Sequence, residues 1–335
     1  MRSAGSLELS LNNRHSFLSA VRRWTYFIAP VLFLFFLFRR LDIDRLQEAF
    51  QRANKLCLLP VIFLYPASIL IGALRWNFLM NCLGNKPVSR SFALTQHWIG
   101  YTAGLLTPGY AGWDLYRLVS GGKATGAYRN GLLIILLERF TSLAAATAIL
   151  LCAAGFLPIA ARSETIWISR TALFLLLASL GALGFLYWEN GRLALRISRF
   201  LKTRSWLDFI PVNPAASLRQ ALPLRRLMWL FGWSTTIQLL TVLNNWLFFH
   251  AVRPLPFTVV AFASPAAVIV TLVPISFAGA GVREFTYLYL YRFFAVQAEE
   301  AVLVSFLNLG GILFNGIIGA GIWVFLAFRK CDTKK

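Results

Sequence analysis

The sequence predicts an all-α integral membrane protein with about six full transmembrane helices and two re-entrant helical hairpins in an inverted repeat. Three observations lead to this prediction: 58% of the 335 residues are hydrophobic, only 14% are charged, and the charged residues leave long gaps between them. Each gap matches or approaches the ~20 residues that cross ~30 Å of hydrocarbon as a helix. Helices are expected because a lipid-exposed backbone must satisfy its own hydrogen bonds.

Six apolar stretches are suited to complete spans. They lie at about 24–39, 57–76, 130–158, 169–188, 227–251 and 300–327. Tryptophans near their ends, such as Trp76, Trp188 and Trp323, suit the membrane–water interface. Residues 41–55 mix acidic and basic residues with apolar ones, which predicts an amphipathic helix on the membrane surface.

The distribution of Lys and Arg predicts the orientation. The longest polar segment, 189–226, holds eight basic residues against two acidic ones, and the tails 1–23 and 329–335 are also basic. Cytoplasmic loops carry such an excess, so we expect this loop and both termini on the cytoplasmic side of the cell (inner) membrane. The formal charge of +20 is then explained by loop position and anionic lipids, and nucleic acid is not expected as a partner.

Two further apolar stretches, about 91–126 and 255–298, are predicted to be the hairpins. The six spans already return the chain to the cytoplasm, so each of these stretches must enter and leave by the same face. The residues 57–158 and 227–327 would then repeat span, hairpin and span with opposite orientation, within one transmembrane domain at 24–328. Inverted repeats with broken helices that meet near the midplane are a transporter design.

Helix-breaking residues interrupt both hairpins with the same spacing. Pro108 and Gly109 stand in the first, and Pro274 begins the break in the second. An arginine follows each proline by nine residues, at Arg117 and Arg283. The alternative is a coincidence between two unrelated loops, because Pro and Gly are common in membrane helices.

The second break carries a resemblance to a known family. The run PISFAGAGVREF, from Pro274 to Phe285, closely resembles the signature of the flippase-like transmembrane region of lysylphosphatidylglycerol synthases. The first break and the pairs Arg75-Trp76 and Glu138-Arg139 agree with that family, and the resemblance covers roughly residues 20–328. The chain departs from the family pattern at Trp113, where a glycine is expected, and at Asn308 or Leu309, where an arginine is frequent.

The resemblance implies a role in moving modified lipids across or between membranes. Aminoacylated phospholipids and hopanoids are the lipids associated with the family, and some members carry a fused soluble transferase domain. The loop 189–226 is too short to fold as such a domain, so the synthase activity is not expected here. No ATP-binding motif is present, so transport would be downhill, ion-coupled or driven by consumption of product.

Glu138 and Arg139 are predicted to lie inside a span, where an ionisable residue costs ~2.5–3.5 kcal/mol on insertion scales. Adjacent helical residues do not face each other, so each needs a partner elsewhere. We expect Arg117 to pair with Glu138, and Asp114 to pair with Arg139. These pairs would serve either structure or function.

Arg117 and Arg283 each follow a hairpin turn, where a helix N-terminus attracts anions. The fork of an arginine matches two phosphate oxygens, so both are candidates to bind a lipid phosphate. Asp114 and Glu284 would cap these helices or balance the charge. The alternative for both arginines is snorkelling to the interface. The full set of predicted substrate-binding residues is Arg75, Pro108, Gly109, Asp114, Arg117, Glu138, Arg139, Pro274, Ser276, Gly279, Gly281, Arg283 and Glu284.

Three polar stripes at helical spacing could line a headgroup path. The stripes are Tyr65, Ser68, Gly72 and Arg75, then Ser234, Gln238, Thr241 and Asn245, then Asn308, Gly311, Asn315 and Gly319. The alternative is helix–helix packing through small residues.

No catalytic grouping, metal site or cofactor is predicted. The three histidines are scattered, the four cysteines lack metal or disulfide spacing, and Asp42-Ile43-Asp44 fits a solvated helix start better than a metal motif. The leading hypothesis is a translocator for a lipid with a phosphate-containing headgroup, such as an anionic phospholipid, aminoacylated lipid, hopanoid or polyprenyl phosphate. The alternatives are a membrane-embedded transferase, with Asp114, Glu138 or Glu284 as base, and an accessory subunit of a separate lipid-modifying enzyme.

Overall fold

The structure of the protein is a computed structural model that describes residues 43–107, 109–126, 128–188, 214–271 and 279–332. Every regular element within these ranges is a helix, as the predicted fold class requires. The elements are α2 (Ile43–Arg52), η1 (Lys55–Leu58), α3 (Leu59–Leu83), α4 (Arg90–Leu105), α5 (Ala111–Thr125), α6 (Tyr128–Ala154), α7 (Ile159–Trp188), α9 (Pro214–Ala221), α10 (Leu224–Val252), α11 (Phe257–Thr271), α12 (Val282–Tyr291), η3 (Arg292–Phe294) and α13 (Ala298–Asp332).

Four helices in the described part of the chain are long and apolar enough to cross a membrane. They comprise Lys55–Leu83, Asn130–Ala154, Ser163–Tyr187 and Ala298–Phe328, and they correspond to four of the predicted spans. α10 has 29 residues but is less apolar, because polar side chains follow one of its faces. The predicted span at 24–39 lies outside the described residues.

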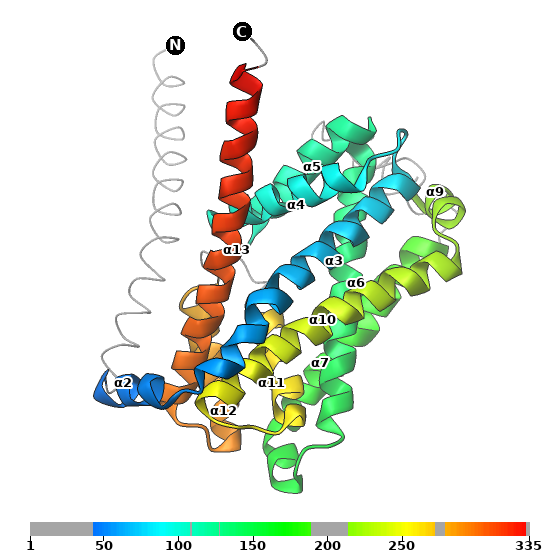
Figure 1. Cartoon of the computed structure of the whole chain (residues 1–335). Coiled ribbons are helices and arrows are strands. Elements are labelled where there is room, and N and C mark those ends of the chain that lie inside the picture. Colours follow the sequence, from blue (N-terminus) through cyan, green and yellow to red (C-terminus); the bar gives the residue numbers. More distant parts are fainter. Residues whose placement is uncertain (1–42, 108, 127, 189–213, 272–278, 333–335) are drawn as a thin grey trace, which may run out of the picture.

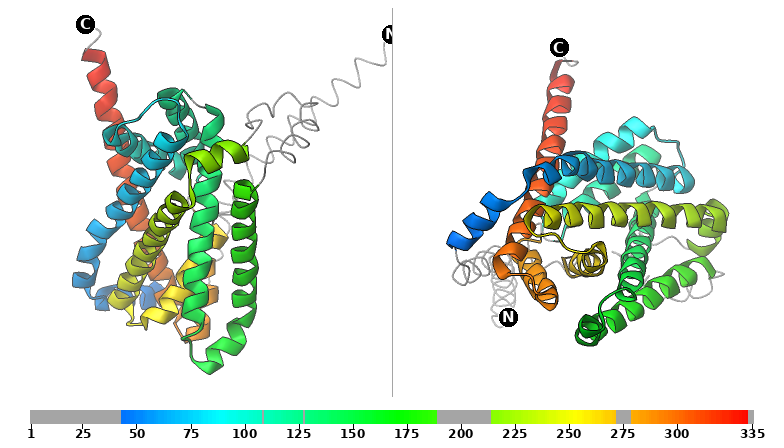
Figure 2. Two further views of the ribbon diagram at one scale, coloured as in Figure 1. Left: turned by 90° about the vertical axis from the view of Figure 1, so that its right-hand side faces the viewer. Right: turned by 60° about the horizontal axis from the view of Figure 1, so that its bottom comes forward.

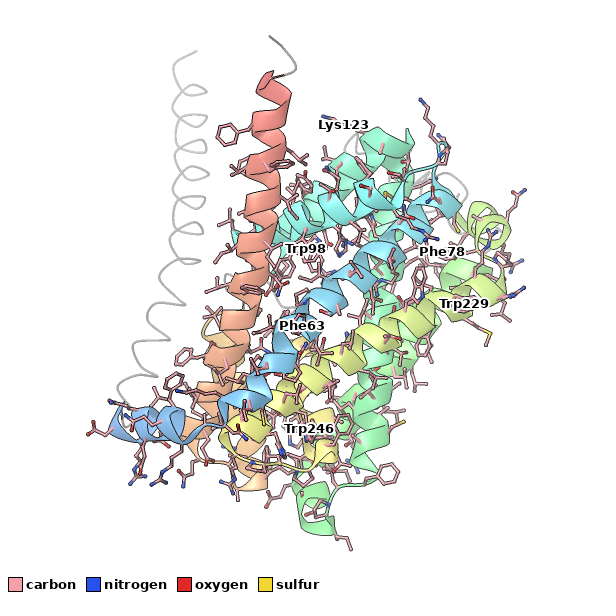
Figure 3. The ribbon with its side chains drawn as sticks, viewed as in Figure 1. Phe63, Phe78, Trp98, Lys123, Trp229 and Trp246 are labelled. Atoms are coloured by element: carbon pink, nitrogen blue, oxygen red, sulfur yellow. The ribbon has the colours of Figure 1, made fainter. Side chains whose placement is uncertain are left out.

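The outer surface of the bundle is apolar. Phe63 on α3 and Trp229 on α10 are both more than half exposed and point away from the bundle (Figure 3), and α7 and α13 carry further exposed phenylalanines and leucines. A soluble monomer rarely exposes contiguous apolar surface on this scale. The surface is that of a multi-pass membrane protein.

The predicted spans are shorter than the observed helices where a charged residue stands near the end of a span. The span predicted to end at Trp76 continues as α3 to Leu83, and the span predicted to start at 169 begins as α7 at Ile159. A buried arginine does not end a helix if its partners lie inside the bundle. Arg75 is therefore an interior residue of α3, with eight residues of the helix after it.

The two predicted hairpins form helix pairs at opposite ends of the molecule. Figure 1 shows α4 and α5 in the upper half, near the C-terminal end of α13, and α11 and α12 in the lower half, near α2. Five long helices (α3, α6, α7, α10 and α13) connect the two halves, with α6 and α7 side by side (Figure 2).

Glycines let α4 and α5 approach closely. A Cβ added at Gly112 would lie 2.5 Å from the Ala103 carbonyl oxygen, and a Cβ at Gly104 would lie 2.9 Å from the Cβ of Trp113. The amide N–H of Gly112 also donates to Thr107 Oγ1 at 2.7 Å, which satisfies a donor at the start of α5. The hairpin is thus held together at its tip.

The other pair is enclosed by the bundle. Residues Val259 to Ala267 of α11 are all buried, and they form the centre of the largest apolar cluster together with residues of α6, α10, α12 and α13. An apolar helix of 15 residues is too short for a complete span, so its burial inside the protein suits a re-entrant element.

Candidate functional site

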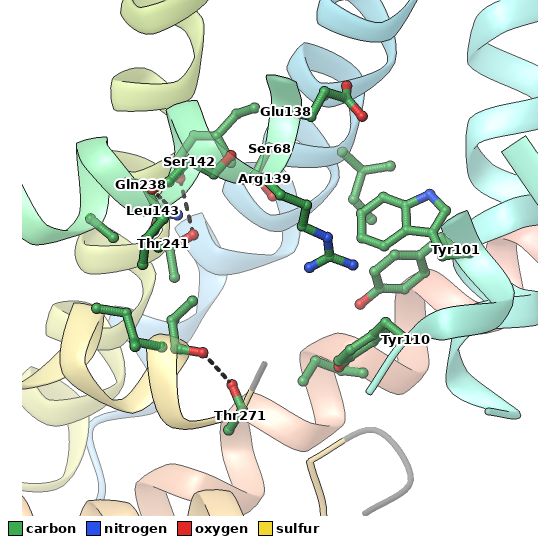
Figure 4. Close-up of a pocket in the computed structure, with 18 of the residues that line it drawn as sticks. Ser68, Tyr101, Tyr110, Glu138, Arg139, Ser142, Leu143, Gln238, Thr241 and Thr271 are labelled. Carbon is green, nitrogen blue, oxygen red and sulfur yellow. Dashed lines mark hydrogen bonds between the residues drawn. The ribbon is translucent and has the colours of Figure 1, made fainter. Parts of the chain in front are cut away.

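A cavity of about 300 Å³ lies between the two helix pairs, with Tyr110 of the first pair and Thr271 and Arg283 of the second in its lining (Figure 4). It is lined by residues of α3, α4, α5, α6, α10, α11, α12 and α13. Six of the predicted site residues line it, namely Arg75, Asp114, Arg117, Glu138, Arg139 and Arg283. Charges that lie up to 208 positions apart in the sequence are therefore brought into one internal space.

Three arginines and two carboxylates form a connected network on one side of the cavity. Glu138 accepts from Arg117 Nη1 at 2.6 Å and from Arg75 Nε at 3.3 Å. Asp114 accepts from Arg117 Nη2 at 2.7 Å and from Arg139 Nη2 at 2.6 Å. Both predicted pairings, Arg117 with Glu138 and Asp114 with Arg139, are confirmed.

Arg117 is the centre of this network and is deeply buried. Only 5% of the residue is exposed, and its guanidinium lies over the rings of Trp113 and Trp76, at 5.1 and 5.8 Å from the centroids. Both terminal nitrogens already bind a carboxylate, on Asp114 and Glu138. Nε has no partner among the described residues. Because the residue is buried and its terminal nitrogens hold two carboxylates, snorkelling to the interface does not describe Arg117.

Arg139 is more accessible than Arg117. Its side chain is 37% exposed and points into the cavity (Figure 4), and both Nε and Nη2 donate to the same Asp114 oxygen. Nη1 has no partner among the described residues. This guanidinium can therefore bind a further anion without breaking its existing pair.

Arg75 ties three long helices together. From α3 it donates to Glu138 of α6 through Nε, and through Nη1 to Ser142 of α6 and Ser234 of α10, both at 2.8 Å. Ser234 in turn lies 3.0 Å from Thr141 Oγ1. These contacts favour a structural role for much of the Arg75 side chain.

The second hairpin supplies a separate charged pair. Arg283 Nη2 donates to Glu284 Oε1 at 2.9 Å, and Arg283 Nε donates to Ser305 Oγ on α13 at 3.0 Å. Glu284 also accepts the amide N–H of Gly281 at 2.5 Å, so it caps α12 as predicted. Asp114 has no such bond and only balances charge. Arg283 Nη1 has no partner within the described ranges.

Glycines with positive φ shape both tips. Gly109 has a φ of 58°, and Gly279 and Gly281 have φ angles of 75° and 81°, a region that residues with a Cβ rarely adopt. Gly279 accepts the amide N–H of Arg283 at 2.8 Å and so starts the α12 turn. Pro108, Pro274 and Ser276, which were also predicted as site residues, lie outside the described residues.

The charges around the cavity leave a positive excess. Four arginines face three carboxylates, counting Glu284 beside Arg283, so one positive charge remains. Each carboxylate is already bonded to at least one arginine. The uncompensated charge lies on the arginines, which favours an anionic ligand over a cationic one.

The predicted polar stripes have different roles. All four residues of the first stripe, and Gln238, Thr241 and Asn245 of the second, line the cavity. In the third stripe only Asn308 does so, donating to Asn245 Oδ1 at 2.9 Å. A Cβ at Gly319 would lie 2.4 Å from the Trp98 carbonyl oxygen, so this part of the third stripe serves helix packing, the alternative stated for it.

Four aromatic residues of the first hairpin line the cavity and were not predicted as site residues. They are His97 and Tyr101 on α4, and Tyr110 and Trp113 at the start of α5. The spacing of four between the first two, and of three between the last two, is helical and was visible in the sequence. It could not be used there, because aromatic residues at such spacing also face lipid.

No group of three His, Cys, Asp or Glu residues in the described ranges is arranged to hold a metal ion. A comparison with protein families matches residues 18–314 to the lysylphosphatidylglycerol synthase TM region. The searches find no match among curated proteins and none among solved structures. The match covers most of the chain and includes every charged residue of the cavity, so the chain belongs to the lysylphosphatidylglycerol synthase TM region family.

Proposed function

We propose that this protein is a lipid translocator that moves a lipid with a phosphate-containing headgroup across the membrane. The observation that carries the proposal is that Arg139 of α6 and Arg283 of α12 line one internal cavity with an excess of positive charge. Each retains a terminal nitrogen without a partner among the described residues. An anion that enters from either face would meet the same pair of guanidinium groups.

The proposed topology has six spans and two re-entrant hairpins, with both termini cytoplasmic. The described residues support it through their charge. Lys86 follows the end of α3, Lys123 lies in the last turn of α5, and Arg225 and Arg226 lie in the first turn of α10. Figure 1 shows these ends of α3, α5 and α10 in its upper half, toward the C-terminus. The opposite end mixes acids and bases, as in the ion pair of Arg253 and Glu300. The more basic end belongs at the cytoplasm.

The proposed path keeps the headgroup in the cavity and the tails in lipid. Arg283 and Arg139 contact the phosphate, Arg117 holds the two carboxylates in place, and Gln238 and Thr241 offer further polar contacts. The transferase alternative needs an available general base. Asp114, Glu138 and Glu284 are each bonded to arginine, which favours the translocator.

The proposal is tested with purified protein in liposomes that contain a headgroup-labelled anionic lipid. Without any added donor substrate, the label should become accessible to a membrane-impermeant quencher while the lipid stays chemically unchanged. Arg139→Ala and Arg283→Ala should each slow this movement at least tenfold. Because both groups serve one headgroup, the double variant should be little slower than the slower single variant.

Arg292→Ala is the matched control. Arg292 directly follows α12, the helix that carries Arg283. Its guanidinium lies over the ring of Tyr289, at 4.1 Å from the centroid, and does not line the cavity. This variant should move lipid at the rate of the unmodified protein. A new lipid species that forms only with donor would show a transferase instead. If the protein neither moves nor modifies anionic, aminoacylated and isoprenoid lipids, the accessory-subunit alternative becomes the better one.

A further inference from the structure

The wall that α4 and α5 present to the cavity holds polar groups without hydrogen-bond partners. Both ring nitrogens of His97, which is 1% exposed, and Nε1 of Trp113 are buried and have no hydrogen-bond partner among the described residues. Tyr101, at 6% exposed, and Tyr110 point their hydroxyls toward the cavity (Figure 4), and neither hydroxyl is bonded within the described part of the chain. Unpaired buried polar groups are rare and unfavourable, so several on one wall indicate a ligand.

The backbone at Tyr110 is strained in a way that supports this. Tyr110 has a φ of 59° and a ψ of 22°, the left-handed region that a bulky residue seldom occupies. The Trp113 amide N–H, which donates to the Tyr110 carbonyl oxygen at 3.0 Å, helps to hold this conformation. Such outliers cluster at ligand sites, because the surrounding structure must sustain their cost. Here the conformation places an aromatic hydroxyl at the tip of the hairpin, inside the cavity.

The rings on this wall pack against one another, with Trp113 edge to face against both tyrosines. The ring centroids of Tyr101 and Trp113 are 5.3 Å apart. The centroid of Tyr110 lies 6.5 Å from that of Tyr101 and 6.4 Å from that of Trp113. Aromatic surface can bind an organic cation, but the guanidinium of Arg117 already lies against the Trp113 ring. With an excess of positive charge around the cavity, a second cation would be repelled. The wall suits a neutral group that has an apolar face and several hydroxyls.

The cavity is also larger than a phosphate requires. Its volume of about 300 Å³ equals that of about ten water molecules, each with a share of ≈ 30 Å³ in the liquid. The arginines of the proposed phosphate site lie on α6 and α12, whereas the aromatic wall belongs to α4 and α5. A phosphate bound between Arg139 and Arg283 would fill only part of this volume, and the rest is bounded by the aromatic wall.

We infer that the aromatic wall of His97, Tyr101, Tyr110 and Trp113 is a second subsite, which binds a sugar ring attached to the lipid phosphate. The inference rests on the proposed function and deepens it by naming the headgroup class, a sugar phosphate. The ring's C–H face packs on the Tyr and Trp rings, and its hydroxyls bond to the hydroxyls of Tyr101 and Tyr110. A headgroup that carries an ammonium group is disfavoured by the four arginines.

The test compares three soluble headgroup probes by calorimetric titration of the full chain in detergent micelles: inorganic phosphate, glucose 1-phosphate and phosphoethanolamine. Glucose 1-phosphate should bind at least tenfold more tightly than phosphate, and phosphoethanolamine no more tightly than phosphate. Tyr101→Phe and Tyr110→Phe keep the rings. Each should weaken the binding of glucose 1-phosphate about three- to tenfold and leave the affinity for phosphate unchanged. Tyr291→Phe is the matched control, because Tyr291 is fully buried outside the cavity, with its hydroxyl 3.3 Å from Ser264 Oγ.

The outcomes separate this inference from the proposed function. Three outcomes would overturn the sugar subsite and leave the phosphate site standing. They are equal affinity for phosphate and glucose 1-phosphate, tightest binding of phosphoethanolamine, and a preference for glucose 1-phosphate that persists in both tyrosine variants. If neither phosphate nor glucose 1-phosphate binds, the anion site itself is wrong and the sugar subsite falls with it.

Discussion

Replacing Glu138 by alanine should destabilise the protein more than any loss of a surface charge. Glu138 is 2% exposed and accepts from both Arg75 and Arg117, so its removal leaves two buried guanidinium groups short of a partner. Breaking a buried ion pair by removing one member typically costs 3–5 kcal/mol. At about 2 °C per kcal/mol for a chain of this size, the unfolding midpoint should fall by roughly 6–10 °C.

The assay is thermal unfolding of purified protein in detergent, followed by tryptophan fluorescence. Glu138→Gln should give an intermediate loss, because the amide keeps one acceptor oxygen but not the charge. Glu48→Ala is the control: it breaks the exposed pair with Arg52 on α2 and should change the free energy of unfolding by less than about 0.5 kcal/mol. A loss below about 1 kcal/mol for Glu138→Ala would refute the reasoning, since it would mean that the two arginines find other partners or water.

Three further predictions concern the hairpins and the topology. Gly112→Ala should lower the free energy of unfolding by about 1–3 kcal/mol, because the added Cβ would lie 2.5 Å from a backbone oxygen. Gly232→Ala is its control, because a Cβ there meets no described atom within 4 Å; it should be neutral or stabilising in the same thermal unfolding assay. Glu284→Gln should lower the free energy of unfolding by about 1.5–3 kcal/mol, because it removes the charge that binds the Gly281 amide and Arg283. An unchanged midpoint of thermal unfolding would argue against a stabilising role of Glu284 as the cap of α12. In intact cells, a single cysteine at position 163 should react with an impermeant reagent and one at position 205 should not, and the reverse pattern would invert the proposed orientation.

Much of the fold could be predicted from the sequence because the membrane constrains it strongly. The gaps between charges located four spans that the structure contains, and the matched breaks located both helix pairs. The pairing of Asp114 with Arg139, and of Arg117 with Glu138, followed from the need to neutralise charges inside hydrocarbon. These predictions succeeded where one physical requirement left few alternatives.

The rest of the site could not be predicted because helical spacing does not say which way a face points. Gln238 and Thr241 line the cavity, whereas Gly319 has the same kind of spacing and packs against α4. His97 is one of three histidines that are scattered along the sequence, and the folded bundle places it beside Trp113 of α5, with 5.0 Å between the ring centroids. Its neighbours come from different helices, so no local pattern marks the residue.

The position of Arg75 limits which parts of the protein can move relative to one another. From α3, its guanidinium donates hydrogen bonds to Glu138 and Ser142 of α6 and to Ser234 of α10. These bonds connect the three helices at one level of the bundle. Pulling these three helices apart at that level would break all three hydrogen bonds of a buried charged group, which is unfavourable by several kcal/mol. Any alternation between inward- and outward-facing shapes must therefore keep them as one rigid frame.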